Sequence, residues 1–190
     1  MIGNDGNDWL IGGVGADALT GGNGYDTASY FSAGAAVVID RATTANSSGE
    51  AAGDTFMTIE AFQLTATYSD RFVGSSGAET VFGGGGNDTL IGSGGNDFLD
   101  GEEQNDVLTG GAGTDTFAFY ETKFGKDTVT DFVNGDLIEF SASAFSDFAA
   151  VQAKIAQVGS NTVTTLDADN TVTLQNVTAA NLKAADFMFV

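Results

Sequence analysis

The sequence predicts an all-β protein, a parallel β-roll that ends in a β-rich cap carrying one short helix. The first observation is a nine-residue pattern, G-G-x-G-x-D-x-U-x with U a large apolar residue, which recurs in tandem and is clearest from Gly83 to Ile91. The second is its composition: the glycine-rich part can turn tightly, and x-U-x can form a short strand with U on one face. Two units would then complete one coil of eighteen residues, so that residues eighteen apart stack at a spacing of about 4.8 Å.

The repeats divide the chain into four regions. Residues 1–29 form a first array, and residues 65–118 form a second array in which the frame continues without a gap. Residues 30–64 interrupt the frame, and we expect them to be an enlarged coil that continues the roll; a separate small domain is the alternative. Residues 119–190 carry no repeat and are expected to form the C-terminal cap.

The acidic residue of each repeat recurs at the same place in every coil. One edge of the roll should carry Asp70, Asp88 and Asp106, the other Glu79, Asp97 and Asp115, and the first array a similar pair, Asp8 and Asp26. Carboxylates about 5 Å apart repel by roughly 3 kcal/mol per pair at an effective dielectric constant of 20. A cation between them relieves this repulsion, and an all-oxygen site rich in turn carbonyls favours Ca²⁺. A flexible Gly/Asp linker would not keep an apolar residue in phase.

This tandem pattern resembles the RTX (repeat-in-toxin, hemolysin-type) calcium-binding family, whose fold is a right-handed parallel β-roll. In that family one Ca²⁺ takes carbonyls from repeat positions two and four, carbonyls from positions one and three of the turn eighteen residues on, and the Asp of both turns. The resemblance implies several Ca²⁺ ions and these metal-site residues: Asn4, Gly6, Asp8, Asp17, Gly21, Asn23, Asp26, Asp70, Ser75, Gly77, Glu79, Gly83, Gly84, Gly85, Gly86, Asp88, Gly92, Ser93, Gly94, Gly95, Asp97, Gly101, Glu103, Asp106, Gly110, Gly111, Ala112, Gly113, Asp115 and Asp127.

Some turns depart from the family pattern. Gln104 replaces a repeat glycine, Glu79 replaces the aspartate, and the turn that ends at Asp70 has lost its glycines. These departures predict weaker or empty sites. Asp127, which lies beyond the last repeat, is interpreted either as a last ligand or as an exposed acid at a strand end.

Composition excludes several classes of function. The chain of 190 residues has 26 acidic and 6 basic residues, a net charge of −20, and neither His nor Cys. This charge argues against nucleic acid or an anionic membrane as a partner, and against compact folding without metal. No apolar run approaches the length of a membrane span, so no membrane insertion is expected. No Ser–His pair, zinc triad or phosphate loop is present, and the chain is not expected to be an enzyme.

Outside the repeats, periodicity predicts the remaining elements. Within the interruption, Ala35–Ile39 and Phe56–Leu64 are expected to be strands. In the cap, Ser146–Val158 is predicted to be a helix capped by Ser146, with Phe148, Val151 and Ile155 on one face. A hairpin should join strands Thr162–Leu166 and Thr171–Leu174, and its acidic turn is interpreted as solvated rather than metal-binding. Thr178–Ala185 is expected to be a short helical turn.

The chain ends in an acidic residue followed by four hydrophobic ones. Asp186, Phe187, Met188, Phe189 and Val190 resemble the type I secretion signal of RTX proteases and lipases; a last strand of the cap is the alternative, and both can hold together. Gly125–Phe132 and Gly135–Phe140 resemble the segment that closes RTX rolls in secreted bacterial proteins. The resemblance implies the type I secretion machinery as a partner.

Three functions compete at this point. The first is a calcium-binding module that folds outside the cell and supports the type I secretion and stability of an extracellular protein, because extracellular modules bind Ca²⁺ at millimolar concentrations. The second is a structural or adhesive cell-surface protein that assembles head-to-tail through an open N-terminal coil. The third is a carbohydrate-binding accessory module of an extracellular enzyme such as an alginate epimerase. The chain begins inside a repeat with no cap, which we take to indicate the C-terminal part of a longer protein.

Overall fold

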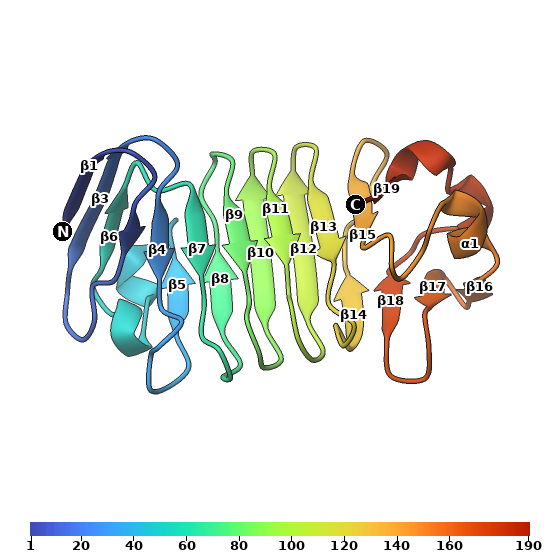
Figure 1. The fold of residues 1–190 in the computed structure, drawn as a ribbon, viewed down its shortest axis with the longest axis horizontal. Helices are drawn as coiled ribbons and strands as arrows, with labels where there is room; N and C mark the ends of the chain where they lie inside the picture. Colours follow the sequence, from blue (N-terminus) through green and yellow to red (C-terminus); the bar gives the residue numbers. More distant parts are fainter.

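The computed structural model describes residues 1–190, and the chain coils into an elongated roll with the cap at the end opposite to the N-terminus (Figure 1). Three sheets are present, with strand orders β1-β3-β6, β16-β17-β18-β14-β12-β10-β8-β5 and β19-β15-β13-β11-β9-β7-β4-β2. The strands are β1 (Ile2–Asp5), β2 (Trp9–Leu10), β3 (Ala18–Asn23), β4 (Thr27–Ser29), β5 (Val38–Asp40), β6 (Thr55–Met57), β7 (Ala61–Gln63), β8 (Arg71–Val73), β9 (Thr80–Phe82), β10 (Thr89–Gly94), β11 (Phe98–Asp100), β12 (Val107–Ala112), β13 (Thr116–Phe119), β14 (Lys126–Val129), β15 (Leu137–Phe140), β16 (Ile155–Val158), β17 (Asn161–Thr165), β18 (Thr171–Leu174) and β19 (Phe187–Phe189).

The strand pairing follows the repeat period. Leu90 in β10 pairs with Leu108 in β12, and Leu99 in β11 pairs with Phe117 in β13, both in parallel and both eighteen residues apart. Successive x-U-x strands therefore alternate between the two long sheets, and each strand stacks on the strand one coil earlier. The predicted parallel β-roll is confirmed.

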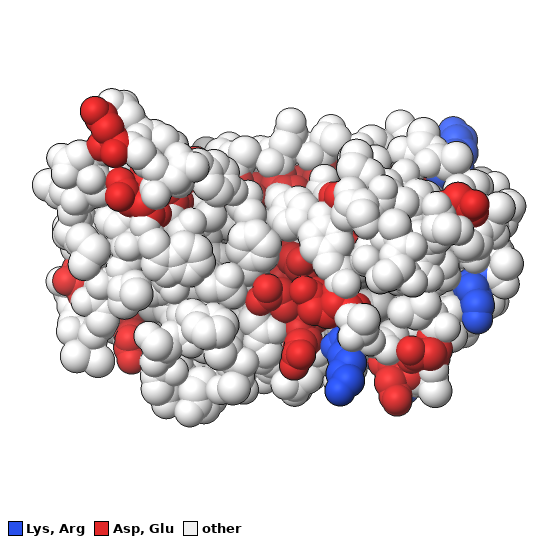
Figure 2. All heavy atoms as spheres, viewed as in Figure 1, with Lys and Arg blue, Asp and Glu red and all other residues white.

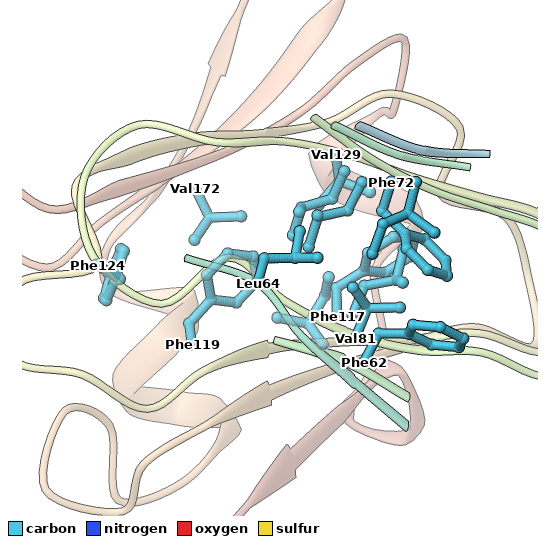
Figure 3. Close-up of a cluster of buried hydrophobic side chains, with 14 of the residues drawn as sticks. Phe62, Leu64, Phe72, Val81, Phe117, Phe119, Phe124, Val129 and Val172 are labelled. Carbon is cyan, nitrogen blue, oxygen red and sulfur yellow. The ribbon is translucent and has the colours of Figure 1, made fainter. Parts of the chain in front are cut away.

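The apolar residue of each repeat points into a narrow core between the two long sheets. Leu90, Leu99, Leu108 and Phe117 are completely buried. Larger side chains such as Phe62, Phe72 and Phe119 fill the same core, as the close-up in Figure 3 shows. Because the strands are so short, the turns lie at the two long edges of the roll, and the acidic residues lie with them.

Residues 30–64 extend the sheets. β4 pairs with β7 and β3 pairs with β6, across the interruption, and β5 pairs with β8 of the second array. The prediction of one continuous strand over Phe56–Leu64 is wrong, because the chain passes from one sheet to another between β6 and β7. Thr58 turns the chain there with a φ of 49°, and its hydroxyl accepts a hydrogen bond from the Gly22 N–H at 2.8 Å.

The expected strand over Ala35–Ile39 begins later in the structure, as β5 at Val38. Val37 instead donates its N–H to the Asp70 carboxylate at 2.7 Å. The N–H of Val37, a residue that the sequence pattern assigned to a strand, therefore bonds to a carboxylate at the acidic edge of the roll.

The predicted cap helix is much shorter than expected. Helix α1 covers only Phe148–Gln152, and its N-cap is Asp147, whose carboxylate accepts a hydrogen bond from the Ala150 N–H at 2.9 Å. Ile155–Val158 forms β16, which pairs antiparallel with β17. The apolar spacing fits a helix, but pairing with β17 across the turn at Gly159, with a φ of 62°, outweighs the local preference.

The last part of the cap closes the sheets. The predicted hairpin is confirmed as β17 and β18, and its Asp167 carboxylate accepts hydrogen bonds from the Asp169 and Asn170 N–H groups, each at 2.9 Å. The expected helical turn is two 3₁₀ turns, Ala179–Asn181 and Ala184–Asp186. β19 then pairs in parallel with β15. No helix of the chain is long and apolar enough to cross a membrane.

Candidate metal sites

The turns of the second array have the conformation that the repeat glycines permit. Gly84 and Gly86, at repeat positions two and four, have φ values of 93° and 128°. Glu102 and Gln104 occupy the same positions one coil later and keep this conformation, with φ values of 64° and 82°. A non-glycine residue adopts positive φ at an energetic cost, so the stack of turns imposes its geometry where the sequence departs from the pattern.

Glycine at repeat position one has a different role. A Cβ atom on Gly83 would lie 2.5 Å from Asp88 Oδ2 and 2.6 Å from the Gly101 carbonyl oxygen. Cβ atoms on Gly92 and Gly110 would likewise collide with the Oδ2 atoms of Asp97 and Asp115. The missing side chain leaves space where a carboxylate oxygen and a carbonyl oxygen of the next coil converge.

The carboxylates form two rows, one along each edge of the roll. In each row the N–H of one acidic residue donates to the carboxylate of the next. The first row contains Asp70, Asp88, Asp106 and Asp127, joined at 2.7, 2.7 and 2.8 Å. The second row contains Glu79, Asp97, Asp115 and Asp136, joined at 2.8, 2.9 and 3.0 Å.

Two shorter sets of the same kind begin in the first array and end in residues 30–64. Asp8 donates its N–H to Asp26 at 2.8 Å, and Asp26 donates to Glu60 at 2.9 Å. Asp17 donates to Asp54 at 2.8 Å. Sequence reasoning missed Asp54 and Glu60, and also Asp136 of the second row, because insertions separate them from their partners by 37, 34 and 21 residues instead of eighteen.

One oxygen of many of these carboxylates has no partner. The Oδ1 atoms of Asp26, Asp88, Asp97 and Asp106 accept the backbone hydrogen bonds of their sets. The Oδ2 atoms of five aspartates, in contrast, are buried without any hydrogen bond. These five are Asp8, Asp26, Asp88, Asp97 and Asp106. An unpartnered buried carboxylate oxygen is strongly unfavourable, and it faces the carbonyl-lined space left by the glycines.

These residues fit a calcium ion. Every available ligand is an oxygen, as a hard cation requires. No three acidic side chains converge on one point, so an ion in a row would take most of its ligands from turn carbonyls. Among the predicted residues, Gly85 and Glu103 form a parallel bridge, and Ser93 pairs with Gly111 and Gly94 with Ala112. The structure thus places side by side the turns that the family pattern predicts to share an ion.

Other carboxylates in the rows are satisfied by the protein itself. Tyr30 donates its hydroxyl to Asp54 Oδ2 at 2.6 Å, and Thr65 donates its N–H to Asp70 Oδ2 at 2.8 Å. Val133 donates its N–H to Asp136 Oδ2 at 2.9 Å. Asp127, which sequence analysis left open between a ligand and an exposed acid, is only 2% exposed and accepts the Asp106 N–H.

Burial changes the protonation of the rows in the absence of metal. Burial, with a smaller contribution from neighbouring acids, raises the pKa of Asp88 and Asp97 to about 7, of Asp127 to about 8 and of Asp106 to about 9. In the unfolded chain an Asp has a pKa of about 3.9. The folded metal-free chain therefore holds more protons than the unfolded chain over this range.

This difference predicts that the metal-free chain loses stability as pH rises. The stabilising contribution of the protonated carboxyls is complete below about pH 4 and disappears as pH rises through the folded-state values, up to about 9. Far-UV circular dichroism of the chelated chain should therefore show less β-structure at pH 8 than at pH 5.5. Asp106→Asn, which mimics the protonated form, should flatten this dependence. A β-structure signal of the chelated chain that rises between pH 5.5 and pH 8 would contradict the assignment.

Comparison with protein families agrees with this geometry. The RTX calcium-binding nonapeptide repeat family matches the chain in four copies, over residues 1–28, 66–99, 73–108 and 82–117. The R3 subunit of the mannuronan C5-epimerase AlgE6 from Azotobacter vinelandii is similar at 31% identity over 65% of this chain and 79% of that subunit, with a TM-score of 0.49. No curated protein matches the chain.

A second solved structure shares the fold over the whole chain. The extracellular lipase LipA from Serratia marcescens aligns with all of this chain at 19% identity and a TM-score of 0.50. The chain spans only 38% of that lipase.

The family matches fall on the two repeat arrays, where the turns and the buried carboxylates lie. The chain belongs to the RTX family of calcium-binding repeats, a type of module found in secreted proteins.

Proposed function

We propose that this chain is a non-catalytic module that folds when it binds Ca²⁺ outside the cell, and that it thereby supports the type I secretion and the stability of an extracellular protein. The observation that carries the proposal is the set of buried aspartate oxygens without partners, at 1–2% exposure for Asp88, Asp97 and Asp106. Ions are expected to supply the missing partners. Because the unfolded chain has no such sites, binding and folding are the same event.

The charge of the chain supports the same mechanism. With a net charge of −20, the metal-free chain repels itself and resists compaction. Figure 2 shows a cluster of acidic side chains in the middle of one face, with the few basic side chains of that face nearer to the cap. At the low Ca²⁺ concentration of the cytosol the chain would stay unfolded and fit for export; at extracellular concentrations, which suit modules with dissociation constants of about 10⁻⁴–10⁻³ M, it would fold.

The C-terminal residues are the proposed export signal. Phe187 is buried in the cap, whereas Met188 and Val190 are 44% and 57% exposed. The segment therefore pairs with the sheet as β19, as a last strand does. Its exposed apolar side chains, however, leave a surface that an exporter could recognise. The two interpretations of this segment are compatible.

An export assay tests this proposal. In a bacterial host with a type I exporter, the parent chain should reach a calcium-containing medium, and the double variant Met188→Gln/Val190→Gln should reach it severalfold less. The control Asp169→Asn lies in an exposed hairpin turn and should be exported like the parent. Circular dichroism should show that all three chains fold with Ca²⁺. Equal export of the double variant would refute the role of the terminal segment.

A second candidate function rests on the N-terminal end of the roll. β1 and β2 each pair with a single neighbour, and the first coil exposes Ile2 by 68%, Trp9 by 59% and Val14 by 85%. Unpaired edges with apolar side chains favour association with another chain. Light scattering in Ca²⁺ separates the candidates: a monomer supports the folding module, and a mass that grows with concentration supports head-to-tail assembly.

A further inference from the structure

One acidic residue of the second row differs from the others in its surroundings. Glu79 stands where the repeat has aspartate, and its side chain is 1% exposed. The Ser75 N–H lies 3.2 Å from each of its carboxylate oxygens, and the Ser75 hydroxyl also donates to Oε1. Both oxygens of Glu79 therefore have partners, unlike the carboxylates of Asp88, Asp97 and Asp106, each of which has a buried oxygen without one.

The remaining partner of Glu79 is a cation supplied by the chain. Arg41 Nη1 lies 2.6 Å from Glu79 Oε1, and this is the single salt bridge of the structure. The side chain of Arg41 is only 16% exposed, so water screens the pair less than it screens a surface pair. The Arg41 guanidinium thus contacts Glu79, the first carboxylate of the second row. We call a pair of carboxylates that are neighbours in a row a rung, so Glu79 and Asp97 form the first rung of the second row.

Residues 30–64 hold Arg41 in place. Arg41 follows β5, and its N–H donates to the Val73 carbonyl at 2.9 Å. Its guanidinium carbon lies 5.0 Å from the centre of the Phe62 ring, a cation–π distance. The interruption between the arrays thus positions one positive charge next to the first carboxylate of the second row.

The next carboxylate of the second row is Asp97. The Glu79 N–H donates to Asp97 Oδ1 at 2.8 Å, so the residue that binds Arg41 is directly joined to Asp97. By the family pattern Glu79 and Asp97, which lie eighteen residues apart, would share a Ca²⁺ ion, and the glutamate at position 79 predicts a weaker or empty site. A fixed guanidinium bonded to one of these two carboxylates already supplies positive charge to the pair.

We propose that Arg41 replaces Ca²⁺ at the Glu79–Asp97 rung. This rung is then neutralised without metal. The unpartnered Oδ2 of Asp97 lies with the Gly110 carbonyl beside Gly92 and belongs to the next rung, Asp97–Asp115, which binds an ion. When the chain folds, the junction between the two arrays needs no ion at this rung, because its positive charge is part of the chain. The inference rests on the proposed function only in that the other rungs bind Ca²⁺.

Counting bound ions tests the proposal. Native mass spectrometry of the whole chain in Ca²⁺ should show one more ion for Arg41→Met than for the parent, since methionine keeps an apolar stem against Phe62 and removes the charge. Arg41→Lys keeps the charge and should show the parent number. Arg71→Met, which removes the one other arginine, is the matched control and should also show the parent number.

A second variant keeps the proposal testable if Arg41→Met does not fold. Glu79→Gln in the parent should lose no ion, whereas Asp88→Asn should lose at least one. Loss of an ion in Glu79→Gln, or an unchanged count in a folded Arg41→Met, would overturn the proposal. A parent chain that binds no Ca²⁺ at all would instead refute the proposed function, so the two failures are distinguishable.

Discussion

Chelation of calcium is expected to convert the chain at pH 8 from a β-rich fold to a largely disordered one, and added Ca²⁺ is expected to restore the fold. The reason is the first row of carboxylates. Its three neighbouring pairs, from Asp70 to Asp127, would repel by about 10 kcal/mol in total if ionised at a spacing of about 5 Å and an effective dielectric constant of 20. This is comparable with the whole stability of a typical domain, about 5–15 kcal/mol.

Far-UV circular dichroism with size-exclusion light scattering measures this transition. Spectra and masses would be compared in EDTA and in about 5–10 mM CaCl₂, at and above the extracellular range. Mg²⁺ at the same concentration is the control, since its demand for octahedral geometry suits these carbonyl-rich turns poorly. A β-rich spectrum in EDTA would show that metal does not fold the chain, and the proposed function would fail.

Substitution of a central aspartate is expected to produce the second large effect. Asp88 lies between Asp70 and Asp106 and contacts both through the row hydrogen bonds, at 2.7 Å each. Asp88→Asn keeps an oxygen that can accept the Asp70 N–H but removes the charge, so it should weaken the two sites on either side. An ion present at 100 times its dissociation constant contributes about 2.7 kcal/mol.

Loss of two such ions should lower the melting temperature in Ca²⁺ by about 10–20 °C, because 1 kcal/mol shifts a domain of this size by about 2–4 °C. Asp97→Asn should remove one ion only, at the Asp97–Asp115 pair of the second row, and should lower the melting temperature by about 5–10 °C. Asp169→Asn, in the exposed hairpin turn, should change neither the melting temperature nor the number of bound ions. Similar losses in all three variants would contradict the assignment of the rows.

The repeat arrays could be predicted from the sequence because their structure is local. Glycines at fixed positions allow the turn, one apolar residue in each repeat supplies the core, and the eighteen-residue spacing sets the register between coils. Leu90, Leu99, Leu108 and Phe117 pair and are buried as the pattern predicts. Even Glu102 and Gln104 follow their neighbours into positive φ.

Prediction failed where long-range pairing competes with local preference. The apolar spacing of Ser146–Val158 fits a helix, but Ile155–Val158 gains a strand partner in β17. The alternation over Phe56–Leu64 fits one strand, but its two halves belong to different sheets. Insertions of variable length also hid Asp54, Glu60 and Asp136, because a sequence period cannot be followed across a gap of unknown length.

The sequence alone determined the coil, the core residue of each repeat and the two acidic edges, since each depends on residues at a constant separation. Only the tertiary structure decided which carboxylates keep an unpartnered oxygen and which are satisfied by the protein. Tyr30 reaches Asp54 across 24 residues, and Arg41 reaches Glu79 across 38. Such contacts carry no periodic signal, because they depend on how the residues between the two arrays fold back onto the edges of the roll.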